Sequence, residues 1–218
     1  MTPTQVVQQV RDITLKLIVA SLVDHQNEPT MIRAGQQSQI GIAASPDLSV
    51  SMQDVPYEAI YNALLAAGAY HLRMIDGALV QFLYTFDRRS LQSHRLAFFP
   101  APALQSYDEA AQIYEDDELF GDIFVINAVR TPIRFDFEIS EEQFVEIDHP
   151  KSHLTLGQYK NCRIPVSGPL TPYRFMRFIL RNFYNAAYPG VDMDQVAART
   201  SFPDTITEKE RRILHVAA

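Results

Sequence analysis

The chain has 218 residues, of which 47% are hydrophobic and 21% are charged, so it is long enough to bury a core as a single globular domain. Its formal net charge of -7 at pH 7 argues against a protein that coats nucleic acid non-specifically, because such proteins have a broadly basic surface. Its single cysteine, Cys162, excludes internal disulfides and cysteine-rich zinc sites and is typical of a reducing compartment.

The N-terminal segment predicts an amphipathic helix rather than a targeting or membrane segment. Thr2 followed by Pro3 is typical of a helix start, because proline has no amide hydrogen and the first position needs none. The residues that recur at helical spacing are Val6, Val10, Ile13 and Leu17. Charged residues interrupt the apolar run well before the roughly 18 residues of a membrane span. We expect this helix to end near Asp24, and the protein to be soluble and cytoplasmic, with no membrane contact.

A second helix is predicted between Asp54 and Gly68, with Pro56 near its start and the glycine as its stop. The Asp76-Gly77 pair then lies between two apolar runs. This pattern predicts a β-hairpin of residues 70–75 and 78–86, because glycine accepts the positive φ angles of tight hairpin turns.

Later segments extend the predicted sheet and add helices. The further elements expected are strands at 94–99, 122–129, 133–138 and 153–157, an acidic helix at 107–118, and a helix at 172–186 with Thr171 as its N-cap. Helices grouped apart from strands predict an α+β fold. We expect one domain, an antiparallel sheet of about five strands with the first helix and the 172–186 helix packed on it. Residues 190–218 are expected to form a peripheral helical tail.

Two of these strands place ionisable side chains on one face each. Side chains alternate along a strand, so Arg134 and Asp136 share a face while the phenylalanines between them take the other. By the same alternation His153 points to one face of its strand, and the leucine that follows it points to the other face. If the two strands are neighbours, an arginine, a carboxylate and an imidazole converge, a combination that binds phosphate and moves protons. The alternative interpretation is a solvated sheet face, which antiparallel sheets commonly have.

The His-Pro-x-x-His segment brings His149 close to His153 in sequence. On a helix this spacing directs both imidazoles to one metal, but Pro150 pushes the preceding residue out of helical geometry, so a loop is expected. A loop still offers a divalent metal the two histidines with either Asp148 or Asp136. We expect no cofactor, because histidines beside turns more often hydrogen-bond to the backbone or act in catalysis without metal.

Arginines supply the candidate anion contacts. Arg163 is flanked by apolar residues, so its charge must reach solvent, a carboxylate or a ligand, and the alternatives are pairing with Asp136 or Asp148 or binding an anion. On the 172–186 helix, 3.6 residues per turn aligns Arg174, Arg177 and Arg181 in one row. The residues predicted to point from this helix into the core are Phe175, Phe178, Ile179 and Phe183. The arginine row could meet phosphate groups or pair with the protein's own acids, the candidates being Glu138, Glu141, Glu142 and Glu146.

Several segments in order resemble a bacterial family recorded as a domain of unknown function, family 2290. The segments are IDGALVQFLYTF, HRLAFFPAP, PIRFDFE, HPKSHLTLGQYKNCRIPV and PLTPYRFMRFILRNFY. They cover most of residues 70–185, and the resemblance implies that this part is the core common to the family, without implying a reaction. The Arg-x-Asp and histidine pairing is also similar, locally, to small bacterial toxin families thought to attack RNA.

Two functional hypotheses follow. The first is an enzyme, a phosphodiesterase or nuclease acting on nucleic acid or a nucleotide. In it His153, with His149 nearby, is the acid or base, Asp136 orients the imidazole, and Arg134 and Arg163 hold phosphate. The second is a noncatalytic subunit that binds a protein partner in a bacterial complex, such as a defence complex, with the same residues as a structural salt-bridge network. We expect Arg134, Asp136, His153 and Arg163 to share one concave polar patch. If His153 and Asp136 lie on opposite faces of the sheet, or far apart with no cleft between them, the enzyme hypothesis fails and the partner-binding hypothesis is the better one.

Overall fold

The computed structural model describes residues 1–42, 55–102, 131–159, 161–196 and 201–218. The acidic helix expected at 107–118 and the strand expected at 122–129 lie outside these residues. The helices are α1 (Pro3–Val19), α2 (Tyr57–Ala66), α4 (Pro172–Phe183) and α5 (Glu208–Arg211), with 3₁₀ turns at Tyr188–Gly190 and Met193–Val196. The strands are β1 (Val23–Gln26), β2 (Thr30–Ala34), β3 (Gln37–Gly41), β4 (Leu72–Met74), β5 (Leu79–Asp87), β6 (Ser90–Phe99), β7 (Ile133–Glu138), β8 (Ser152–Leu156) and β9 (Ile164–Pro165).

These strands form one antiparallel sheet in an α+β fold, as expected for the class. The order is β1-β4-β5-β6-β7-β8-β9, and the far end of β5 pairs with β3, which in turn pairs with β2. The expectation of about five strands was wrong, since nine are found among the described residues. The additional strands are mostly β1 to β3, which are short and largely exposed and therefore resemble polar loops in sequence.

The Asp76-Gly77 hairpin is confirmed. Strands β4 and β5 pair antiparallel on either side of it. Gly77 has φ +82, and the Asp76 carboxylate accepts a hydrogen bond of 3.1 Å from the amide of Ala78. The sequence therefore predicted both the turn and its chemistry, because each depends on residues that are adjacent in the chain.

Helix α1 begins as expected but ends earlier. Thr2 caps it, with its hydroxyl accepting from the amide of Gln5. The helix ends at Val19 rather than near Asp24, because Ser21 adopts a left-handed conformation with φ +55. The amide of Leu22 then bonds back to the carbonyl of Leu17, and both leucines are fully buried, as in a Schellman motif without its usual glycine.

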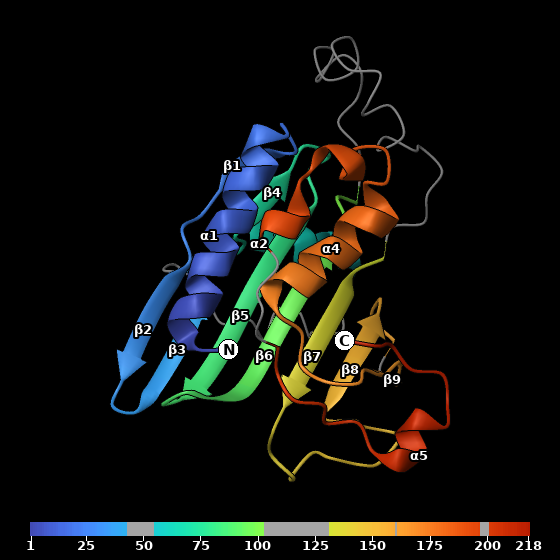
Figure 1. Ribbon diagram of the computed structural model, residues 1–218. Coiled ribbons are helices and arrows are strands. Elements are labelled where there is room, and N and C mark those ends of the chain that lie inside the picture. Colours follow the sequence, from blue (N-terminus) through green and yellow to red (C-terminus); the bar gives the residue numbers. More distant parts are fainter. Residues whose placement is uncertain (43–54, 103–130, 160, 197–200) are drawn as a thin grey trace.

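Helices α1 and α4 cover one face of the sheet (Figure 1). The amide of Tyr173 in α4 donates to Oε1 of Gln9 in α1, which links the two helices. Thr171 caps α4 as expected, and Phe175 is fully buried against Phe82 and Phe135. Phe183 was expected in the core but is 39% exposed, because α4 ends there and the next residue, Tyr184, fills the core instead.

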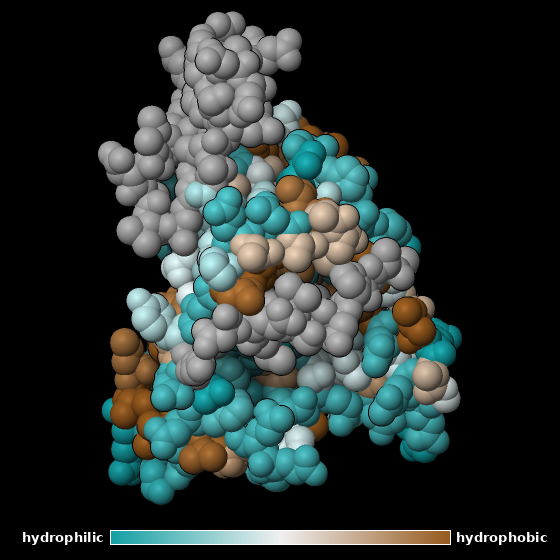
Figure 2. All heavy atoms as spheres, turned by 180° about the vertical axis from the view of Figure 1, so that it is seen from behind, coloured by the Kyte–Doolittle hydropathy of each residue, from teal (hydrophilic) through white to brown (hydrophobic). Residues whose placement is uncertain are grey.

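Helix α2 packs on the other face of the sheet. Its Ile60 and Leu64 form a separate apolar cluster with Leu79 and Phe99, whereas Val80, the neighbour of Leu79, belongs to the main core under α1 and α4. Alternation along the strands thus gives the sheet two covered sides. Figure 2 views the molecule from this second side and shows hydrophilic side chains over much of its lower part.

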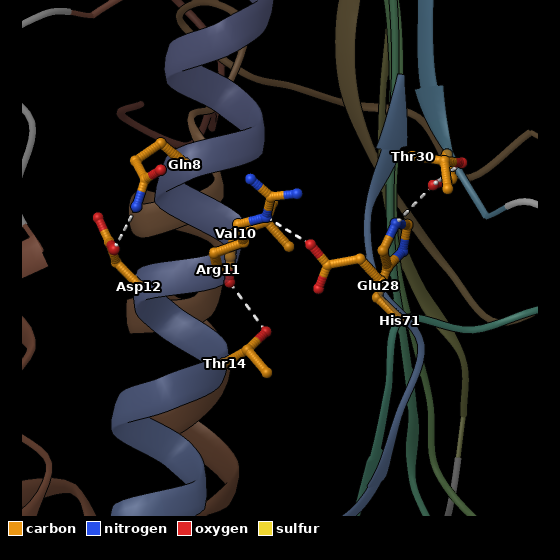
Figure 3. Close-up of polar contacts among 9 residues, drawn as sticks. Gln8, Val10, Arg11, Asp12, Thr14, Glu28, Thr30 and His71 are labelled. Carbon is orange, nitrogen blue, oxygen red and sulfur yellow. Dashed lines mark hydrogen bonds and ion pairs between the residues drawn. The ribbon is translucent and has the colours of Figure 1, made fainter. Parts of the chain in front are cut away.

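The segment after Gly190 is not confined to the periphery. Met193 and Phe202 are buried, and the Phe202 ring stacks on Tyr84 with centroids 6.4 Å apart. Val216 forms a parallel bridge to Val166, so the tail closes one end of the core. At the opposite edge of the sheet, Arg11 of α1 forms an ion pair with Glu28 in the β1–β2 connection (Figure 3). Among the described residues no helix has the length and apolar character needed to cross a membrane.

Candidate active site

A row of charged residues crosses three neighbouring strands. In the strand register Arg95 of β6 lies opposite Asp136 of β7, and Asp136 lies opposite His153 of β8. Directly opposed residues in antiparallel strands share a face and have neighbouring side chains. The sheet therefore brings these three groups together on the face that α1 and α4 leave free.

Asp136 is held as a carboxylate by two arginines. Its Oδ1 accepts a 2.9 Å hydrogen bond from Nε of Arg95, and its Oδ2 lies 3.8 Å from Nε of Arg134. Burial favours the neutral acid, but the two guanidinium groups outweigh burial and lower the pKa of Asp136 below its ordinary value of 3.8. The aspartate is therefore ionised throughout the physiological pH range.

His153 has a fixed tautomer. Its Nδ1 lies 2.9 Å from the carbonyl oxygen of Pro150, and a carbonyl can only accept, so Nδ1 is the protonated nitrogen and Nε2 has the lone pair. Nε2 lies 4.0 Å from Oδ2 of Asp136, too long for a hydrogen bond. Burial lowers the pKa of His153 below 6.5, although Asp136 opposes the shift. At neutral pH the ring is a neutral proton acceptor.

His149 lies beside this ring in a loop, as Pro150 predicted. The two imidazole centroids are 5.2 Å apart in an edge-to-face arrangement. Paired backbone hydrogen bonds between Val145 and His149 close the loop, and Ile147 within it has φ +76. Partial burial and the charge of Arg163 lower the pKa of His149. Two adjacent imidazoles can therefore exchange protons with one bound substrate.

These groups line a single pocket of about 730 Å³. The predicted residues that it brings together are Arg134, Asp136, His149, His153 and Arg163, and the strand β6 adds Arg95. The expected concave polar patch is thus present in the structure. Tyr57 at the start of α2, together with Gln158 and Asn161 after β8, supplies further walls.

Two of the arginines in the pocket, Arg134 and Arg163, have guanidinium groups that can still bind an anion. Nη1 of Arg134 is buried and has no hydrogen-bond partner among the described residues. Arg163 lies within 4.0 Å of no described carboxylate, so the expected alternatives of pairing with Asp136 or Asp148 are not realised. Burial and the charges of Arg95 and Arg163 lower the pKa of Arg134 in spite of Asp136. An anion in this pocket would relieve that crowding of positive charge.

Arg174, Arg177 and Arg181 are not part of the pocket. They are exposed on α4, which packs on the side of Phe135, whereas the neighbouring Arg134 and Asp136 face the pocket. Successive residues of a strand point to opposite sides, so the arginine row and the histidines lie on opposite faces of the sheet. The helical row itself is as predicted, with Phe175 buried and Phe178 half-buried on the inner side.

Sequence reasoning missed Arg95. It lies in the predicted strand 94–99, between the buried residues His94 and Leu96, and the alternation that placed Arg134 and Asp136 would have placed it on the polar face. The sequence left open a metal site at His149 and His153 with Asp148 or Asp136. Over the part of the chain that the structure describes, no three or more histidine, cysteine, aspartate or glutamate side chains are grouped so as to hold a metal ion.

Comparison with known proteins identifies the family. The chain is a member of the family described as "Uncharacterized conserved protein (DUF2290)", whose model matches residues 22–218. The match therefore includes β1 to β3 and the C-terminal tail as well as the 70–185 segment that carries the sequence resemblance. Searches of curated proteins and of solved structures found no match to the chain.

Proposed function

We propose that the pocket binds the phosphate group of a nucleic acid or nucleotide and hydrolyses a phosphodiester bond. The observation that carries this proposal is the fixed tautomer of His153, whose Nδ1 is held by the Pro150 carbonyl so that the basic Nε2 is left for a substrate. Arg163 without a described carboxylate partner, the unbonded Nη1 of Arg134 and a neutral imidazole in one pocket suit a reaction in which negative charge enters and a proton is removed.

Each residue of the pocket has a separate role in the proposed hydrolysis. Nε2 of His153 takes a proton from a water molecule as the water oxygen attacks phosphorus. Arg163 and Nη1 of Arg134 bind the non-bridging oxygens and stabilise the charge that develops on them. The bond from phosphorus to the leaving oxygen breaks, and His149 in its protonated form donates a proton to that oxygen.

Asp136 has a supporting role that differs from the one expected from sequence. The Pro150 carbonyl, not the aspartate, orients the His153 ring. The carboxylate lies 4.0 Å from Nε2 and is held by Arg95, so it stabilises the imidazolium that forms once the ring has taken a proton. It also sets the position of the Arg134 guanidinium.

The direct test is a hydrolysis assay on the purified chain. Bis(4-nitrophenyl) phosphate, single-stranded RNA and single-stranded DNA are the substrates, and we expect turnover of at least one of them. His153→Ala should lower the rate about 100-fold or more, as loss of a general base does. His215→Ala, at a half-buried histidine outside the pocket, is the matched control and should retain the rate. Equal rates in His153→Ala and the unaltered chain would refute the assignment.

A second candidate is a noncatalytic subunit that binds a protein partner. The observation that favours it is that the Asp136 carboxylate is satisfied by the chain's own arginines and that His153 is only 8% exposed, as in a structural network. Under this proposal no substrate is turned over, and His153→Ala lowers the melting temperature while altering no reaction. The assay above therefore separates the two candidates.

A further inference from the structure

Helix α4 lies on one face of the sheet (Figure 1) and presents a second cationic site. The histidine pocket lies on the other face. Arg174, Arg177 and Arg181 are all exposed and lie three and four residues apart, on one face of the helix. At 1.5 Å per residue the row is about 10 Å long. With Tyr173, Asn182 and Asn185 these arginines line a groove of about 800 Å³.

Within the described segments no acid pairs with this row. None of the three arginines lies within 4.0 Å of a carboxylate in the described segments, although the chain has a net charge of -7. Two of the four acids considered as partners are engaged elsewhere, since Glu141 pairs with Lys151 and Glu146 pairs with Lys209. A cluster of unpaired positive charge attracts anions even on a protein whose net charge is -7.

One aromatic residue pre-arranges two of the guanidinium groups. Nε of Arg177 donates a 3.2 Å hydrogen bond to the hydroxyl of Tyr188, and the Arg181 guanidinium lies 6.0 Å from the centroid of the same ring. These contacts hold the arginines without cancelling their charge. A pre-ordered pair loses less conformational entropy when a ligand binds.

We propose that this groove binds the sugar-phosphate backbone of a single-stranded nucleic acid, at a site separate from the histidine pocket. Along a row of about 10 Å, the three long and flexible arginine side chains can each reach a phosphate of one strand. Tyr173 and the half-buried Phe178 in the groove offer rings on which unpaired bases stack, which a duplex does not provide. The asparagine side chains add neutral donors and acceptors for base edges.

The test is binding of a fluorescein-labelled 12-nucleotide oligothymidylate, followed by anisotropy over a series of salt concentrations. The variant removes all three charges, as Arg174→Gln, Arg177→Gln and Arg181→Gln. Each lost phosphate contact should reduce the magnitude of the slope of log K against log salt by about 0.7. The slope of the triple variant should therefore be smaller in magnitude by about 2. If affinity at 1 M salt is unchanged, that slope corresponds to about 100-fold weaker binding at 0.1 M salt.

A matched variant controls for net charge. Arg33, Arg89 and Arg212 are exposed, lie outside the groove and form no ion pair with a described residue, so their triple change to glutamine removes the same charge. It should leave the slope and affinity nearly unchanged. The measurement reports binding and not turnover, so this result stands or fails apart from the proposed hydrolysis.

Three results would overturn the proposal. One is an unchanged slope in the α4 triple variant, and another is an equal loss in the control triple variant. The third is equally tight binding of oligoglutamate or of a 12-base-pair duplex, which would indicate an acidic protein partner or a duplex instead. If the triple variant does not fold by circular dichroism, Arg174→Gln and Arg181→Gln singly should each lower the slope by about 0.7.

Discussion

Asp136 and His153 face each other directly across the β7–β8 pairing, with Oδ2 of the aspartate 4.0 Å from Nε2 of the histidine. At this separation there is no hydrogen bond, but an imidazolium would be attracted strongly to the carboxylate. The pair is therefore loose while His153 is neutral and tightens when the ring gains a proton. This behaviour suits a base that is protonated only during a reaction.

Removing the Asp136 charge should destabilise the fold. Asp136→Asn keeps the size of the side chain but leaves Arg95 and Arg134 partly buried with no opposite charge between them, so we expect a loss of about 3 kcal/mol in the free energy of unfolding. Asp24→Asn is the control, because it breaks the more exposed pair with Arg73 and should cost less than about 1 kcal/mol. Urea unfolding measures both, and equal losses would contradict the prediction.

The parts of the fold that the sequence predicted depend on local chemistry. The Asp76-Gly77 turn follows from two adjacent residues, and the faces of Arg134 and Asp136 follow from alternation along one strand. The short connection between β7 and β8 made them probable neighbours, and the register places Asp136 opposite His153. The pocket could be anticipated for these reasons.

The parts that were missed depend on non-local packing or on backbone atoms. β1 pairs with β4, and β2 pairs with β3, which pairs with the far end of β5. These pairings are a property of the assembled sheet and not of the polar sequences of β1 to β3. Ser21 ends α1 where glycine is usual. The Pro150 carbonyl that orients His153 is an acceptor every residue has, so no pattern identifies it. The arginine row on α4 was predicted, but a helix pattern does not specify which sheet face it covers.

Two buried histidines should make stability depend on pH. Burial lowers the pKa values of His71 and His94 from 6.5 to about 4. In the unfolded chain these rings gain protons below pH 6.5, while in the fold they stay neutral, so stability is full above pH 6.5 and is lost as pH falls toward 4. The shift corresponds to about 3 kcal/mol for each histidine.

The change His94→Gln tests this origin. The slope of the unfolding free energy against pH is set by the number of protons that the chain takes up on unfolding. Between pH 6.5 and 4.5 this number should be smaller by about one in His94→Gln than in the unaltered chain. His25→Gln, at an exposed histidine, should leave the slope unchanged. A slope that is the same in His94→Gln would show that other groups cause the acid sensitivity.

Phosphate should stabilise the folded chain through the pocket. Inorganic phosphate at about ten times its Kd should add about 1.4 kcal/mol, which is a rise of roughly 3–5 °C in the melting temperature for a domain of this size. Arg163→Gln should abolish most of the rise, whereas Arg33→Gln on exposed β2 should retain it. Scans at constant ionic strength measure the effect. An undiminished rise in Arg163→Gln would place the anion elsewhere.

The loop that borders the pocket after β8 depends on Gly157. This residue has φ +63, and a Cβ there would lie 2.7 Å from Oγ1 of Thr131. Gly157→Ala should cost about 2 kcal/mol or more, from left-handed strain plus the steric clash. Gly35→Ala has the same strain with no atom within 4 Å and should cost about 1 kcal/mol.

A double variant separates the two causes. Thr131→Ala removes the clashing hydroxyl, so adding it to Gly157→Ala should reduce the loss to the level of Gly35→Ala in urea unfolding. If the double variant remains as unstable as Gly157→Ala, strain rather than the close contact dominates at this position.

The pH profile of hydrolysis tests the two histidines together. Burial lowers the pKa values of both His153 and His149 below 6.5. A base must be neutral and an acid must be protonated, so the rate should rise with pH as His153 loses its proton and fall as His149 loses its own. Because both pKa values are lowered, the maximum of the bell should lie below pH 6.5.

The acidic and alkaline limbs of the pH–rate profile can be assigned to His153 and His149 with variants. Initial rates of hydrolysis of single-stranded RNA or DNA, whose leaving alkoxide needs a proton, between pH 4 and 8.5 and under conditions limited by kcat/KM, give two apparent pKa values that belong to the coupled pair. His149→Ala should remove the alkaline limb and leave a slower reaction that reaches a plateau, because the leaving oxygen then takes its proton from water. Asp136→Asn should move the acidic limb to lower pH, since the carboxylate no longer favours the imidazolium. An optimum above pH 7.5, or an alkaline limb that persists in His149→Ala, would contradict these roles.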